Sequence, residues 1–64
     1  MVSDRDIWAA ANEVIRSEAD PSLYAATRCS ELIEAGDLEG CAFWWRIGVA
    51  IRAFLATNPP GQVH

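Results

Sequence analysis

The side chains best suited to chemistry are few and lie far apart along the chain. The pair Trp44-Trp45 offers two indole rings, Arg52 offers a guanidinium within an apolar stretch, and His64 is the single histidine. An indole face can stack on a base or sugar ring, and a guanidinium can hold a carboxylate or a phosphate. A general base needs a second group to orient it, and no such group accompanies His64. We therefore expect no enzymatic activity, no catalytic residue and no cofactor.

A group of carboxylates around the middle of the chain supplies oxygen atoms of the kind that bind hard cations. Its members are Glu31, Glu34, Asp37 and Glu39. Their spacing differs from that of a calcium-binding loop, and Asp37 is better explained as a helix cap. We expect no metal site here, and recognition of a basic partner is the alternative.

Cys29 and Cys41 lack the C-x-x-C spacing of zinc or redox motifs and are too few for a secreted disulfide framework. We interpret both as small buried apolar residues, and their spacing leaves open whether they lie close together. The first six residues carry acids where a secretory signal carries positive charge. Both observations predict a reducing cytoplasm.

Charge excludes two classes of partner. Nine acids face five bases, all of them arginine and all scattered singly, which gives a formal net charge of −4. Binding to nucleic acid or to an anionic membrane surface requires a concentration of positive charge that this chain lacks. The 64 residues are 52% hydrophobic, too apolar for a disordered segment and too interrupted for a membrane span. We expect a single small globular domain whose partners are proteins.

Capping residues predict the first two helices. Ser3 is a good N-cap with Asp6 at the capping-box position, so a helix should run from Ser3 to about Glu18. Asp20-Pro21 places a cap before a proline at the first helical position and so begins a second helix, which should stop at Gly36.

The dipeptide Gly36-Asp37 should end the second helix in a left-handed turn and cap the third. Helices two and three then form a tight αα-hairpin, and helix three spans roughly 38–56, before the stop at 58–61. The expected fold is all-α, a three-helix bundle over residues 1–57, followed by a flexible C-terminal tail at 58–64.

Helix three is apolar around roughly 260° of its circumference, which is more than one small core needs. Its polar strip holds Glu39, Arg46, Ala50 and Ala53. One apolar flank holds Trp44, Ile47, Ile51 and Phe54; the other holds Leu38, Cys41, Trp45, Val49 and Leu55, with Arg52 between the flanks. Helices one and two can cover only one flank, so the other should form an interface.

The pattern alone leaves the choice of flank open. We assign Trp44, Ile47, Ile51 and Phe54 to the interface and Trp45 to the core. Gly48 lies in the middle of this helix and should permit close approach of a neighbouring helix.

These features predict a small protein–protein interaction module, an adaptor or regulator, that acts as a homodimer through helix three. A chain this short commonly enlarges its core by self-association. One alternative is a small-molecule binder with an apolar groove in which Arg52 anchors an anion. The simpler explanation for an arginine at this apolar position is an ion pair with Asp4, Glu18 or an acidic residue of a partner. Another alternative is an accessory subunit of a larger complex.

Several short segments resemble a family of small bacterial proteins, found mainly in alphaproteobacteria, that contain a domain of unknown function. The matching segments are 7–10 (Ile-Trp-Ala-Ala) and 35–37 (Ala-Gly-Asp), and the matching single residues are Gly40, Trp45, Ile47 and Ile51. The resemblance covers most of the chain and implies a bacterial cytoplasmic origin. It implies no site residue, because the family carries no assigned activity.

Overall fold

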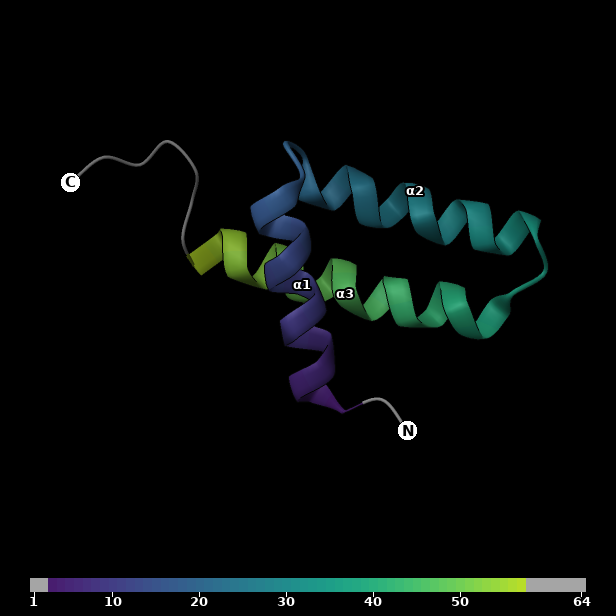
Figure 1. Ribbon diagram of the computed structural model, residues 1–64, viewed down its shortest axis with the longest axis horizontal. Coiled ribbons are helices and arrows are strands. Elements are labelled where there is room, and N and C mark those ends of the chain that lie inside the picture. Colours follow the sequence, from purple (N-terminus) through teal and green to yellow (C-terminus); the bar gives the residue numbers. More distant parts are fainter. Residues whose placement is uncertain (1–2, 58–64) are drawn as a thin grey trace.

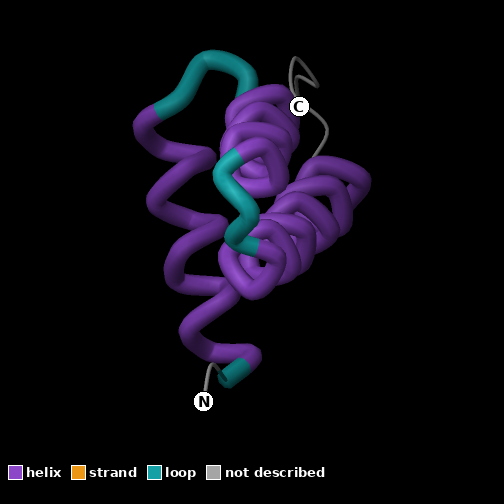
Figure 2. Tube along the Cα trace, turned by 90° about the vertical axis from the view of Figure 1, so that its right-hand side faces the viewer, coloured by secondary structure: helices purple, strands orange, loops and turns teal. Residues whose placement is uncertain are grey.

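The computed structural model describes residues 3–57, and its helices form an all-α three-helix bundle (Figure 1). The helices are α1 (Asp4–Ser17), α2 (Pro21–Glu34) and α3 (Leu38–Thr57), and the part of the chain described contains no strand. In Figures 1 and 2, α2 and α3 lie side by side as one layer, and α1 crosses this layer. The predicted fold class is therefore confirmed. The tail expected at 58–64 lies outside the described residues.

The first two helices begin where the sequence predicts, because both caps form. The Ser3 hydroxyl accepts a hydrogen bond from the Asp6 N–H at 3.2 Å, and the Asp6 carboxylate accepts one from the Ser3 N–H at 3.3 Å. The Asp20 carboxylate accepts a hydrogen bond from the Leu23 N–H at 3.1 Å, and Pro21 occupies the first turn. These side chains satisfy N–H groups that a helix start leaves without an intrahelical partner.

Three residues make the turn between α2 and α3. Gly36 has a φ of +82°, a value that glycine adopts without steric strain. The Asp37 N–H donates to the Leu32 carbonyl at 2.8 Å and the Gly36 N–H to the Ile33 carbonyl at 3.0 Å, which closes α2. The Asp37 carboxylate then accepts a hydrogen bond from the Gly40 N–H at 2.8 Å. Asp37 thus completes one helix and caps the next, as predicted.

The core lies where α3 meets the other two helices, which have little contact with each other. Its buried members are Ile7, Ala11, Val14, Ala25, Ile47, Ala50 and Ile51. Each helix contributes one alanine, and small side chains let helix backbones approach closely. Ala50 was predicted to lie on the polar strip of α3; this was wrong, because α1 crosses the strip at that point and buries the residue.

The two cysteines form a disulfide that joins α2 to α3. The interpretation of Cys29 and Cys41 as small buried apolar residues is therefore wrong, because both are only partly buried and they are covalently paired. Because the hairpin turn fixes the alignment of α2 against α3, residues twelve apart in sequence face each other across the two helices.

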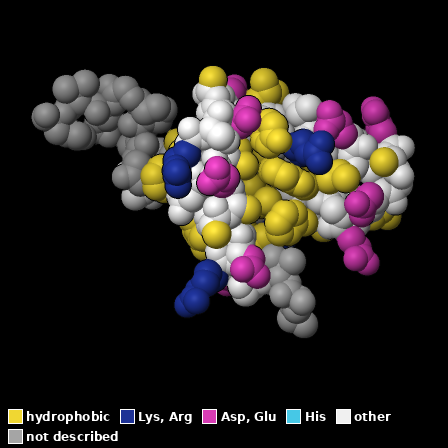
Figure 3. Space-filling view, in the orientation of Figure 1, with side chains coloured by type: hydrophobic (Ala, Val, Ile, Leu, Met, Phe, Trp, Pro, Cys, Tyr) yellow, Lys and Arg dark blue, Asp and Glu magenta, His cyan; other side chains and the backbone are white. Residues whose placement is uncertain are grey.

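Within residues 3–57, no helix is both long enough and apolar enough to cross a membrane. Figure 3 shows that apolar side chains continue over the hairpin surface beyond the strip that α1 covers. This uncovered apolar surface contains the candidate functional site.

Candidate protein interface

The structure reverses the predicted assignment of the flanks of α3. Ile47 and Ile51, assigned to an interface, are 0% exposed and form the centre of the core. Trp44 and Phe54 are half-buried, and Trp45, assigned to the core, is 61% exposed. The two flanks are similarly apolar, so only the positions of α1 and α2 decide which of them is covered. Those positions belong to the tertiary structure and cannot be read from the sequence of α3 alone.

Trp44 is held within the bundle by its neighbours. Its ring meets those of Tyr24 and Phe43 edge to face, with centroids 5.7 Å and 6.1 Å away. The Arg28 guanidinium lies 5.8 Å from the centroid of the indole ring and also pairs with Glu31 at 2.9 Å. Such contacts stabilise an aromatic side chain where it is. Trp44 therefore serves as an internal packing residue and is a poor candidate for an interface anchor.

Among the described residues, more large apolar side chains are exposed than buried. The buried ones are Ile7, Val14, Ile47 and Ile51; the exposed ones are Trp8, Leu23, Ile33, Leu38, Trp45 and Val49. Three of the exposed six border one depression of about 440 Å³ between α1 and α3. We name this depression the α1/α3 groove; its lining residues are Asp4, Ile7, Trp8, Trp45, Arg46, Val49, Ala50 and Ala53. Concentrated exposed apolar surface of this kind marks interaction sites.

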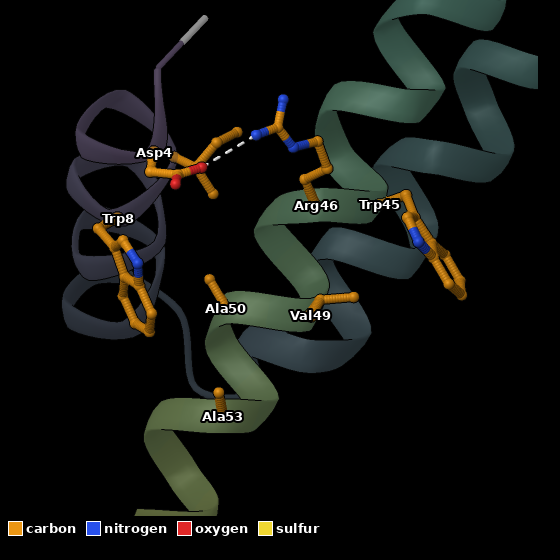
Figure 4. Close-up of a pocket in the computed structure, with 8 residues that line it drawn as sticks. Asp4, Trp8, Trp45, Arg46, Val49, Ala50 and Ala53 are labelled. Atoms are coloured by element: carbon orange, nitrogen blue, oxygen red, sulfur yellow. Dashed lines mark hydrogen bonds and ion pairs between the residues drawn. The ribbon is translucent and has the colours of Figure 1, made fainter.

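Figure 4 shows how the groove is built. The side chains of Val49, Ala50 and Ala53 form its floor along α3, with the Trp8 indole on α1 to one side and the Trp45 indole on the other. The floor lies below the indole walls because two of its three side chains are alanine methyl groups. Two large aromatic walls beside a floor of small side chains form a slot that an apolar side chain or helix of a partner can fill.

Trp8 lies on α1 and was missed as a groove residue, because the predicted interface was assigned from helix three alone. A signal for it exists in the sequence, because Trp8 follows the core residue Ile7 directly. Adjacent helical side chains diverge by roughly 100°, so one of such a pair must point away from the core centre.

The charges at the groove cancel. Asp4 and Arg46 form an ion pair at 3.2 Å where α1 approaches α3, and this pair marks one end of the groove in Figure 4. Their side chains are 89% and 50% exposed, so the pair adds little to stability. Its effect at the surface is that the two charged residues lining the groove sum to zero. The net charge of −4 therefore resides elsewhere on the molecule.

Arg52 occupies a different setting from the one predicted. Its guanidinium carbon lies 6.0 Å from the centre of the Trp45 ring, and within residues 3–57 no carboxylate reaches it at ion-pair distance. The ion pair expected with Asp4 is instead made by Arg46, because Arg46 is the α3 residue that faces the start of α1.

The carboxylates near the hairpin turn do not converge. In the part of the chain that the structure describes, no three histidine, cysteine, aspartate or glutamate side chains come together as metal ligands do. Arg28 neutralises Glu31, and Asp37 is engaged as a helix cap.

Comparison with known proteins does not assign the chain to a family. No family model, no curated protein and no solved structure matches the chain. The resemblance to a small alphaproteobacterial family therefore stays a prediction, and a functional proposal has to rest on the surface of the molecule.

Proposed function

We propose that this protein is a small protein–protein interaction module, an adaptor or regulator, that forms a homodimer through the α1/α3 groove. The observation that carries the proposal is the concentration of Trp8, Trp45 and Val49 around one groove of a bundle whose core holds only four large side chains. Tryptophan in a hollow surface is a frequent source of binding energy in protein complexes. Helix three stays the main contributor, as the sequence predicts, but through its other flank.

A second copy of the chain is the occupant that the charges favour. Two molecules that each carry −4 repel one another, and the repulsion is weakest at a face whose own charges cancel. At the groove Asp4 and Arg46 provide both signs, so Asp4 of one copy can meet Arg46 of the other. A two-fold dimer places the same patch on both subunits and so covers both grooves in one contact.

The test is the molar mass of the untagged protein by light scattering over about a hundredfold dilution, since dimer content follows concentration. Val49→Glu places a charge on the groove floor, and Ile33→Glu is its matched control on α2. The two side chains are comparably exposed, at 46% and 54%, but only Val49 lines the groove. Helicity measured by circular dichroism verifies that both variants fold, and Trp8→Ala challenges the opposite wall of the groove.

We expect the wild type and Ile33→Glu to approach twice 7.0 kDa at the higher concentrations and Val49→Glu and Trp8→Ala to stay near 7.0 kDa. A wild type that remains at 7.0 kDa throughout would contradict the homodimer and leave the groove to a different protein, as in an accessory subunit. Equal loss of dimer in Val49→Glu and Ile33→Glu would place the interface elsewhere.

The cytoplasmic location stays a prediction, and the cysteine pair supplies its test. Disulfides persist in oxidising compartments, whereas cytosolic thiols are kept reduced. Alkylation of intact source cells before lysis should label Cys29 and Cys41 if the protein resides in the cytoplasm. Recovery of the Cys29–Cys41 cross-linked peptide without label would contradict that location.

A further inference from the structure

A second hollow, of about 250 Å³, lies between α2 and α3. We name it the α2/α3 hollow. Trp44 and Trp45 line it from α3, and two small residues, Ala25 and Ala26, line it from α2. A cavity of about 150 Å³ is enough to bind benzene in a protein interior. The hollow therefore has room for one aromatic ring with a short substituent, against walls that favour ring contacts.

Gly48 lies on the wall of this hollow, and nothing in the fold itself requires a glycine there. Its φ is not positive, unlike that of Gly36. A Cβ at position 48 would stand 3.7 Å from the Ala25 Cβ, which is ordinary van der Waals contact. The prediction that Gly48 permits close approach of helices is therefore not needed to explain the packing. A glycine inside a helix lowers stability relative to alanine. Its structural effect here is to leave the hollow open.

The polar groups of the hollow are one cation and one hydroxyl. Arg52 lines it from α3, and Ser22 lines it from the first turn of α2. Arg16, Arg28 and Arg46 each have a carboxylate partner, whereas Arg52 has none within residues 3–57. The Ser22 hydroxyl makes no hydrogen bond to another described side chain or backbone group. Acids outnumber bases nine to five in this chain, yet the Arg52 guanidinium beside the hollow has no carboxylate partner among the described residues. It is therefore available to bind the anionic group of a ligand.

We propose that the α2/α3 hollow binds a small aromatic carboxylate. The ring lies against Trp44 and Trp45 in the space that Gly48 leaves, and the carboxylate accepts hydrogen bonds from the Arg52 guanidinium and the Ser22 hydroxyl. A planar guanidinium matches a carboxylate in two-point hydrogen bonding, which is why a carboxylate is the anion named. The hollow is lined by α2 and α3 alone, whereas the homodimer is proposed at the α1/α3 groove, and Trp45 is the one residue that lines both.

The experiment is a titration of the ¹⁵N-labelled protein with 3-phenylpropionate, followed through the indole N–H signals of the tryptophans. The neutral isostere 3-phenylpropionamide is the ligand control. Arg52→Gln removes the cation, and Arg5→Gln is its matched control, an exposed arginine outside the hollow that also lacks a carboxylate partner among the described residues. Gly48→Ala adds one methyl group to the wall.

We expect saturable shifts with 3-phenylpropionate, weaker binding by about tenfold or more for the amide and for Arg52→Gln, and no change for Arg5→Gln. Gly48→Ala should bind more weakly while unfolding at a higher urea concentration than the wild type, a combination that damage to the fold would not produce. Absence of saturable shifts overturns the proposal, as does equal binding by Arg52→Gln and the wild type. Unchanged binding in Gly48→Ala overturns the placement of the ring.

Discussion

The two apolar flanks of α3 have similar composition and different fates. On the inner flank Ile47 and Ile51 are closed off by α1 and α2, while on the outer flank Trp45 and Val49 remain exposed beside the α1/α3 groove. Hydrophobicity along a helix therefore sets how much surface must be covered, whereas tertiary packing sets which part is covered within the chain. The surface left over is available for binding.

The largest expected effect tests whether the inner flank of α3 is the core. Ile47→Ala should lower the free energy of unfolding by about 2–5 kcal/mol, because it leaves a cavity in a core with few large side chains. Urea denaturation followed by circular dichroism measures the change. If the alanine variant does not fold, Ile47→Val should still show a loss of about 0.5–1.5 kcal/mol. A loss below 0.5 kcal/mol for both would mean that the inner flank is not the core.

The disulfide tests whether α2 is held on the inner flank by a covalent link as well as by packing. Replacing both Cys29 and Cys41 by serine should lower the free energy of unfolding by about 3 kcal/mol, as expected for a short loop closed by a cross-link. Urea denaturation of the wild type with and without a reductant measures the same quantity independently. A wild type that is insensitive to the reductant would show that packing alone holds the hairpin.

The hairpin cap closes the turn through which α2 leads into α3, the helix that carries both flanks. Asp37→Ala should lower the free energy of unfolding by about 1 kcal/mol, since the N–H of Gly40 loses its partner. Asp37→Asn keeps an acceptor and should stay close to the wild type. Thermal denaturation measures both variants, and equal losses for alanine and asparagine would contradict the capping role.

The outer flank should show the smallest effect on the folded monomer. Trp45→Ala should change the free energy of unfolding by no more than about 0.5 kcal/mol at concentrations where the monomer prevails, because the side chain is 61% exposed. Urea denaturation at low protein concentration measures it. A loss comparable to that of Ile47→Ala would remove the distinction between the flanks.

The helices and their ends were predictable because they depend on local chemistry. The Ser3 box, the Asp20-Pro21 start and the Gly36-Asp37 turn each act through residues within a few positions of one another. Propensity and capping are properties of short segments, so a single sequence contains them. The predicted helix bounds consequently agree with α1, α2 and α3 to within a residue or two.

The site was not predictable in the same way because it depends on where α1 crosses the hairpin. The assignment of Trp45 to the core, of Ile51 to the interface and of Ala50 to the polar strip all fail for this one reason. The proximity of Cys29 and Cys41, which the sequence left open, likewise follows from the alignment of α2 against α3 across the turn. When a helix is apolar on two sides, its own sequence does not indicate which side the rest of the chain covers.

Trp45 lines both the α1/α3 groove and the α2/α3 hollow, so one side chain is shared by two surfaces that would otherwise be separate. Any ligand that shifts the orientation of this indole alters the free energy of the contact on its other side. By thermodynamic linkage, an acid that favours dimerisation must bind the dimer more tightly than the monomer, and an acid that opposes dimerisation must bind it more weakly. Where the proposed homodimer and the proposed acid site both hold, assembly of the bundle depends on the concentration of the acid through Trp45.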